Sequence, residues 1–326
     1  MPRVGSASWP CPSPEAADSP VPVQAVLIAG PTASGKSGVG LELAGRFGGT
    51  VINADSIQLY RELRVLTARP SQRNEARVPH RLYGTVAAAE AYSVGRWLDD
   101  VTEALADARG NGSLPILVGG TGLYFKALTE GLAPIPDISV EVRSYWRQHA
   151  ARCSREALHE ELAARDPAMA ARLWSADRQR LVRALEVIDA TGISLAEWQG
   201  GQTAPLLAAR ETVRLVIAPE REPLYGAIEA RFDGMIARGA IDEVSDLLAL
   251  ELDPGLPAMR AHGVRELAAF LSGATSREDA VVKAKTESRR YAKRQLTWAR
   301  RFMTDWEWFP DPNTAIEAAT VTLARR

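Results

Sequence analysis

One short loop near the N-terminus constrains this 326-residue chain more than any other feature. It has the form G-x-x-x-x-G-K-[ST], in which the glycines allow a tight turn whose backbone N–H groups point at phosphate oxygens. The lysine adds a positive charge, and the final hydroxyl can reach a magnesium ion. The loop therefore predicts a phosphate- or diphosphate-binding site. Its residues are Gly30, Pro31, Thr32, Ala33, Ser34, Gly35, Lys36 and Ser37.

The segments around this loop predict an α/β fold. Short apolar runs alternate with helical patterns, which is typical of a parallel sheet with helices on both faces. We expect a P-loop NTPase-like, doubly wound core with an all-helical insertion, because residues 139–198 contain no strand candidate. The expected strands are Ala25–Ala29, Thr50–Ala54, Pro115–Val118 and Thr212–Ala218. The expected parts are a disordered leader at 1–22, a core at 23–135 and 206–326, and the insertion at 136–205.

Composition excludes several other classes of protein. Hydrophobic residues make up 46% and charged residues 24%, which is average for a globular chain and unlike a disordered, collagen-like or coiled-coil sequence. No apolar run has the length of about 18 residues that a membrane span needs, so no membrane partner is expected. Cys11 and Cys153 form no disulfide framework and no zinc motif, which favours a reducing, cytoplasmic location. We expect a monomer.

Two polar residues follow predicted strands and complete the candidate site. Asp55 comes directly after the second strand, and Thr121 follows the glycine-rich end of the third. Ligands of doubly wound sheets bind outside the carboxyl ends of the strands, so both side chains should face the phosphate loop. There Asp55 could hold magnesium or act as a base; the alternative for each residue is a cap of a helix or turn.

Eight segments, in this order along the chain, together resemble the tRNA dimethylallyltransferases, also called tRNA isopentenyltransferases. The resemblance covers roughly residues 24–309. The chain ends soon after the last segment, without the zinc finger of some eukaryotic relatives, which favours the bacterial type. The segments are GPTASGKS at 30–37, NADSIQLYREL at 53–63, TARP at 67–70, VGGTGLYFKALTEGLAP at 118–134, DRQRLVRALEV at 177–187, TGISLAEWQ at 191–199, LPAMRAHGVREL at 256–267 and RRYAKRQLTW at 289–298.

The resemblance implies a reaction and its participants. Dimethylallyl diphosphate donates its five-carbon group to the exocyclic amine of the adenosine 3′ of the anticodon, in tRNAs that read codons starting with U. Diphosphate leaves, with Mg²⁺ as cofactor. The resemblance places the proton acceptor on Asp55, sets Thr121 beside the reacting groups, and lets Arg231 contact the diphosphate; the alternative for Arg231 is a solvated charge on a helix face.

The resemblance also implies residues that contact the anticodon stem-loop of tRNA. Basic residues gather in the insertion and in 283–301, which suits a phosphate backbone, although a solvated amphipathic helix is the alternative for either cluster. Gln58 is expected to read the edge of the flipped adenine. The implied tRNA contacts are Asp55, Ser56, Ile57, Gln58, Thr121, Arg143, Gln179, Arg180, Leu181, Val182 and Arg183.

Two departures from the family pattern leave the residues of the reaction intact. Residues 261–264 read Ala-His-Gly-Val where the family continues with an aliphatic residue, Gly and Tyr, and Arg69 stands where Lys is common. We interpret His262 as a packing or surface residue. Three alternative functions stay open: an adenylate isopentenyltransferase acting on free AMP or ATP, a P-loop small-molecule kinase, and a non-catalytic tRNA-binding protein with a relict loop.

Overall fold

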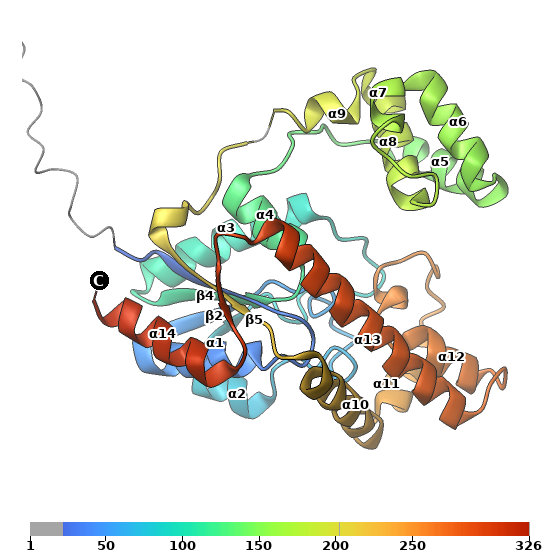
Figure 1. Ribbon diagram of the computed structural model, residues 1–326. Coiled ribbons are helices and arrows are strands. Elements are labelled where there is room, and N and C mark those ends of the chain that lie inside the picture. The colour runs from blue at the N-terminus through green and yellow to red at the C-terminus, as the bar shows by residue number, and fades with distance from the viewer. Residues whose placement is uncertain (1–21, 202, 326) are drawn as a thin grey trace, which may run out of the picture.

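The computed structural model of the protein describes residues 22–201 and 203–325 (Figure 1). Nearly all of the leader expected at 1–22 lies outside the described residues. The core is a six-stranded parallel sheet with the order β3-β2-β4-β1-β5-β6, which confirms the predicted α/β class. The strands are β1 (Ala25–Ala29), β2 (Gly49–Asn53), β3 (His80–Arg81), β4 (Leu114–Gly119), β5 (Thr212–Ile217) and β6 (Glu307–Phe309).

Helices cover both faces of this sheet. Alternate residues of a strand point to opposite faces, so Leu27 of β1 packs into one core while Val26 and Ile28 pack into the other. The helices α1 (Lys36–Phe47) and α14 (Pro312–Ala324) cover the second face. The first face is covered by α3 (Val94–Gly110), α4 (Gly122–Glu130), α10 (Arg221–Ala237), α11 (Ala240–Leu248), α12 (Val264–Leu271) and α13 (Arg277–Phe302).

Two edge strands were not predicted. β3 has two residues and β6 has three, which is too short for a two-residue period to show in the sequence. Both pair with longer strands, β3 with β2 and β6 with β5, so tertiary pairing rather than local propensity defines them. The short elements α2 (Gln72–Arg77), η2 (Ala209–Glu211) and η3 (Ala258–Arg260) complete the core.

A separate cluster of helices stands off the sheet and is joined to it by two extended segments (Figure 1). Its helices fall inside the expected insertion, and side chains between Ile138 and Leu195 form a hydrophobic core of their own. A side-chain oxygen of Ser, or of Asp, caps the start of each helix. The helices are α5 (Val140–Arg152), α6 (Arg155–Arg165), α7 (Pro167–Ala170), α8 (Arg178–Thr191) and α9 (Leu195–Trp198).

Across the described residues, no helix combines the length and the apolar character that crossing a membrane requires. The long helix α13 runs diagonally over the core and contacts α4, α10 and α12 (Figure 1). It therefore connects the end of the sheet that carries the phosphate loop with the helices on its first face.

Candidate active site

Strand register brings three loops to one edge of the sheet. Ala29 pairs with Gly119, and Asn53 pairs with Val118, so β1, β2 and β4 end side by side. The loops that follow carry the phosphate loop, Asp55 and Thr121. The expectation that these three groups gather at the carboxyl ends of the strands agrees with this arrangement.

The end of β4 has no room for side chains. A Cβ on Gly119 would lie 1.9 Å from the Ala54 carbonyl oxygen, and a Cβ on Gly120 would lie 2.1 Å from the Gln295 amide nitrogen. This close approach explains why the strand ends in glycines rather than in the magnesium-binding carboxylate of many nucleotide hydrolases. The carboxylate whose charge acts on Lys36 comes instead from the loop after β2, at Asp55.

Lys36 is buried in the phosphate loop, where its ammonium donates a 3.1 Å hydrogen bond to the Pro31 carbonyl oxygen. Burial lowers the pKa of Lys36 to about 8; the Asp55 carboxylate opposes this shift and Arg231 adds to it. The lysine is consequently still mostly protonated near pH 7. Its ammonium makes one hydrogen bond within the described residues, to the Pro31 carbonyl oxygen, so its remaining N–H groups can bind a ligand. It is a preformed site for an anion.

A cavity of about 70 Å³ joins the phosphate loop to α10 and α13. Arg231 lines it, so the alternative of a solvated helix-face charge is wrong for this residue. Burial lowers the pKa of Arg231, and the Asp55 carboxylate raises it. The polar groups of the cavity therefore combine two cations with one carboxylate. The cavity is lined by Thr32, Lys36, Asp55, Ile57, Gln58, Leu66, Thr67, Ile228, Arg231, Phe232, Met235, Ala261, His262, Ser288 and Tyr291.

Asp55 is held in a tight turn at this cavity. Its Oδ1 accepts a 3.1 Å hydrogen bond from the Ile57 backbone, and its own N–H donates to the Asn53 side chain at 2.9 Å. The turn-cap interpretation of Asp55 is thus correct for one oxygen, while the carboxylate still lines the cavity. Gln58 also lines it, but its amide nitrogen donates to the Thr67 carbonyl at 2.9 Å.

Thr121 stands at the start of α4 without capping it. Its hydroxyl oxygen instead accepts a 2.9 Å hydrogen bond from the Ser56 backbone N–H and lies 3.2 Å from the Ser56 hydroxyl. Thr121 is therefore the N-cap residue of α4 by position but makes no capping hydrogen bond with its side chain, which instead ties the loop after β4 to the loop after β2.

A second cavity, of about 250 Å³, lies between the phosphate loop, α4 and α13. Ser56 and Thr121 line it together with mostly apolar side chains, among them Phe125 and Trp298. Tyr291 lines both cavities, so they meet at α13. A flat apolar group could enter the second cavity beside Thr121 while an anion occupies the first.

Comparison with known proteins assigns the family. A family model described as IPP transferase matches residues 58–302, and one described as isopentenyl transferase matches residues 23–88. The chain belongs to the IPP transferase family. A "tRNA dimethylallyltransferase" of Bradyrhizobium sp. is 57% identical over 87% of this chain and 93% of the relative, and one of Azorhizobium caulinodans is 52% identical over 92% and 96%.

Solved structures agree with this assignment. The tRNA isopentenylpyrophosphate transferase of Bacillus halodurans has a TM-score of 0.66 and 33% identity, covering 92% of this chain and 95% of that one. A eukaryotic dimethylallyltransferase acting on tRNA has a TM-score of 0.72 and 28% identity, covering 84% of this chain and 69% of that one.

In this member of the IPP transferase family, helix α13 contributes site residues that the sequence analysis does not predict. The stretch 283–301, here called the basic arm, is predicted to contact tRNA, yet Tyr291, Gln295 and Trp298 within it face the phosphate loop and the loop after β4. The Thr32 N–H, expected to bind diphosphate, donates to the Gln295 side chain at 3.0 Å. The glycines at 119, 120 and 122 are the available signal, because a side chain at any of these positions would clash with a close neighbour.

Both departures from the family pattern lie near the site. His262 contacts the Tyr291 ring, with centroids 4.1 Å apart, and lines the first cavity, so it is not a surface residue. Burial, together with Arg294, lowers the pKa of His262, which keeps the imidazole neutral at pH 7. Arg69 donates to the carbonyls of Tyr60 and Arg61, at 3.3 and 3.1 Å, and so stabilises the loop after Gln58.

The insertion presents only part of the tRNA contacts implied by the resemblance. Leu181 is fully buried in the helical core, which rules out a side-chain contact with RNA, and Val182 is half-buried against that core. Gln179 and Arg180 are exposed, and Arg180 lies 3.4 Å from Asp177. Two more arginines are half-buried: Arg143, whose Nε has no hydrogen-bond partner within the described chain, and Arg183, 3.5 Å from Glu186.

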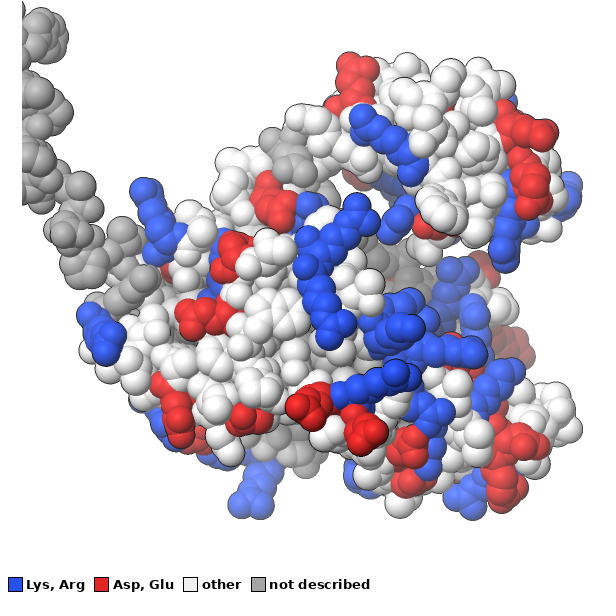
Figure 2. Space-filling view, viewed as in Figure 1, with Lys and Arg blue, Asp and Glu red and all other residues white. Residues whose placement is uncertain are grey.

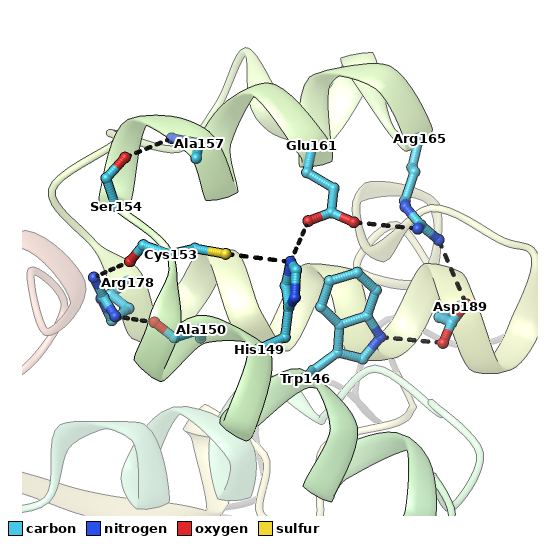
Figure 3. Close-up of polar contacts among 10 residues, drawn as sticks. All are labelled: Trp146, His149, Ala150, Cys153, Ser154, Ala157, Glu161, Arg165, Arg178 and Asp189. Carbon is cyan, nitrogen blue, oxygen red and sulfur yellow. Dashed lines mark hydrogen bonds and ion pairs between the residues drawn. The ribbon is translucent and has the colours of Figure 1, made fainter.

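One further arginine of the insertion, Arg178, makes polar contacts within the insertion itself (Figure 3). Arg178 donates to the backbone carbonyls of Ala150 and Cys153 and so caps the end of α5, rather than offering its charge to RNA. The Cys153 thiol lies 3.4 Å from the His149 ring, and that ring contacts Glu161 at 2.8 Å. These contacts hold α5, α6 and α8 together.

Cations of α13 and of the insertion face each other across the hollow between the two parts of the molecule (Figure 2). Three of the eight cations expected in the basic arm are paired with acidic residues: Lys285 with Asp233 at 2.6 Å, Arg289 with Glu229, and Arg290 with Glu287. These three therefore have acidic neighbours within the chain, and their contact with RNA phosphates stays a prediction. No ion pair within the described chain involves Lys283, Lys293, Arg294, Arg300 or Arg301.

Proposed function

We infer that this chain transfers the dimethylallyl group of dimethylallyl diphosphate to an adenosine of tRNA. The observation that carries this function is a single cavity in which Lys36, Arg231 and Asp55 meet at the end of a phosphate loop, in a chain of the IPP transferase family. Two cations suit a diphosphate, and one carboxylate suits a proton acceptor.

We propose that the donor lies with its diphosphate on the loop Gly30–Ser37, against Lys36 and Arg231. As the bond between the allylic carbon and the diphosphate oxygen breaks, its electron pair leaves with the diphosphate, so negative charge grows beside these two cations. Their burial strengthens this interaction, because little water screens it. The apolar side chains of Ile228, Phe232 and Met235 in the same cavity suit the five-carbon group.

Asp55 is the proposed proton acceptor. The exocyclic amine of adenosine is a poor nucleophile, because its lone pair is delocalised into the ring. As the new nitrogen–carbon bond forms, the amine must lose a proton, and a carboxylate within reach accepts it. The turn that fixes one oxygen of Asp55 leaves the other oxygen for this role.

The adenine is proposed to enter through the second cavity, beside Thr121. Taking a base out of its stack costs a few kcal/mol, which stacking on aromatic side chains and hydrogen bonds can offset. Trp298 and Phe125 supply apolar walls, and Ser56 with Thr121 supplies hydroxyl groups. The RNA backbone would lie in the hollow between α13 and the insertion, where the cations gather.

The divalent cation expected for such a reaction is proposed to be Mg²⁺. Mg²⁺ commonly keeps several waters and binds through one or two protein oxygens plus substrate phosphates. The exposed hydroxyl of Ser37, which makes no hydrogen bond within the described residues, fits this sparse donor set. No group of three or more His, Cys, Asp or Glu side chains in the described chain could hold a metal by itself. When bound, the ion would neutralise charge on the leaving diphosphate.

One assay separates this function from its alternatives. The enzyme is incubated with labelled dimethylallyl diphosphate, Mg²⁺ and either unmodified tRNA or AMP. We expect label in the tRNA only. Label in AMP would instead indicate an adenylate isopentenyltransferase, and transfer of the terminal phosphate of ATP without prenyl transfer would indicate a kinase. Binding of tRNA without any transfer would indicate a relict loop.

A further inference from the structure

One side chain of α13 bridges the two loops that carry the substrates in the proposed function. Gln295 accepts a 3.0 Å hydrogen bond from the Thr32 N–H through Oε1 and donates a 2.9 Å hydrogen bond to the Gly120 carbonyl through Nε2. These partners are 263 and 175 residues away in the sequence. The amide is therefore a tertiary link rather than part of a local turn.

The surroundings of this amide leave it little freedom. A Cβ on Gly120 would lie 2.1 Å from the Gln295 nitrogen and 3.2 Å from the Gly30 carbonyl oxygen, and a Cβ on Gly122 would lie 2.1 Å from the Trp298 ring. The loop after β4 is thus packed against both α13 and the start of the phosphate loop. A side chain at position 120 would therefore have to displace the Gln295 amide.

The two bridged residues lie at the proposed binding places of different substrates. Thr32 lines the cavity of Lys36, where the donor diphosphate is proposed to lie, and Gly120 directly precedes Thr121, beside which the adenine is proposed to enter. We propose that Gln295, which also lines the second cavity, is a positioning residue that sets the distance between donor and acceptor. This inference rests on the proposed function.

An amide is suited to this task, because it accepts one hydrogen bond and donates another from the same planar group. A glutamate of the same shape could accept from the Thr32 N–H but could not donate to the Gly120 carbonyl. It would also place a negative charge beside the diphosphate. A leucine of similar size could make neither bond, so the two variants separate the bridge from the charge.

The test compares Gln295→Leu and Gln295→Glu with Gln72→Leu and Gln72→Glu, matched controls at an exposed position of α2. For Gln295→Leu, we expect kcat for transfer to tRNA to fall about tenfold to hundredfold, because misplaced reactants lose rate, while the affinity for inorganic diphosphate stays within about threefold. For Gln295→Glu, we expect the same loss in kcat together with a higher KM for dimethylallyl diphosphate.

The outcomes distinguish this inference from the function on which it rests. An unchanged kcat in both Gln295 variants, with active wild-type enzyme, overturns the positioning role alone. A parallel loss of kcat and of diphosphate affinity in Gln295→Leu also overturns it, since that result means that the residue only stabilises the phosphate loop. A wild-type enzyme that transfers no dimethylallyl group to tRNA overturns the proposed function itself.

Discussion

The charge of Lys36 depends on two opposing effects at the residue scale. Burial disfavours the ammonium, and the neighbouring Asp55 carboxylate favours it, with the balance leaving the pKa at about 8. A free lysine titrates more than two units higher. The ammonium charge of Lys36 is therefore lost as the pH rises through about 8, a range that experiments can reach.

This balance predicts how donor capture depends on pH. The proposed diphosphate contact needs the ammonium form of Lys36, which is lost as the pH rises through about 8, so kcat/KM for dimethylallyl diphosphate should fall above that pH. Initial rates at saturating tRNA and varied donor concentration would measure it. Lys36→Arg, which stays charged, should remove the falling limb. A wild-type profile that stays flat well above this pH would contradict the assignment.

A second residue-scale prediction concerns Asp55→Asn. The asparagine oxygen can still accept the hydrogen bond from the Ile57 N–H, so the turn should persist, but the amide cannot take up a proton. We expect kcat to fall roughly 10²–10⁴-fold with tRNA affinity retained, as measured by single-turnover transfer and by equilibrium binding. Asp99→Asn, an exposed position on α3, is the control. Near-normal turnover would remove Asp55 from the role of base.

At the scale of elements, the helical cluster has a core that contributes nothing to the sheet. Trp146 of α5 is fully buried in that core, donates a 3.1 Å hydrogen bond to Asp189 of α8, and is stacked by Arg165 of α6. One side chain therefore joins three helices. The sheet, by contrast, depends on the packing of β1 between β4 and β5.

Trp146→Ala should weaken the binding of tRNA without changing the binding of diphosphate. Removing a buried tryptophan costs about 3–5 kcal/mol of stability, which is a large loss for a core as small as that of the helical cluster. We expect faster hydrogen exchange across α5, α6 and α8 and weaker tRNA binding, with the affinity for inorganic diphosphate unchanged. Gln148→Ala, an exposed position on the same helix, is the control. Equal loss of both affinities would mean that the chain unfolds as one unit.

At the scale of the whole molecule, charge distribution matters more than total charge. The net charge of the chain is −1, so any attraction for RNA comes from the cations that line the hollow between α13 and the insertion (Figure 2). Three cations of α13 have acidic partners, so we expect the unpaired ones, such as Lys293, to contact phosphates most readily. Phosphate contacts of this kind release counterions and make binding sensitive to salt.

Lys293→Glu should therefore weaken tRNA binding and make its salt dependence shallower, by about one unit in the slope of log K against log [salt] for one lost phosphate contact. Fluorescence anisotropy at several salt concentrations would measure the slope. Arg73→Glu on α2, an exposed cation outside both basic clusters, changes the net charge equally and should leave the slope unchanged. An unaltered slope for Lys293→Glu would exclude this position from the RNA interface.

Local sequence was sufficient to predict several parts of this protein. The phosphate loop, the four longer strands and the all-helical stretch follow from glycine spacing, apolar runs and capping residues, which act over a few neighbours. The meeting of Asp55 and Thr121 at one edge also followed, because parallel strands align their carboxyl ends.

Tertiary structure alone decided the rest. The periodicity of 277–302 predicts a helix but not which of its faces meets the phosphate loop, so the contacts of Tyr291 and Gln295 could not be predicted from the sequence. Likewise, the partners of Arg178 and Arg289 lie 28 and 60 residues away. Hydrogen bonds and ion pairs at such separations depend on how whole elements pack, and packing selects among faces that are equivalent in local sequence.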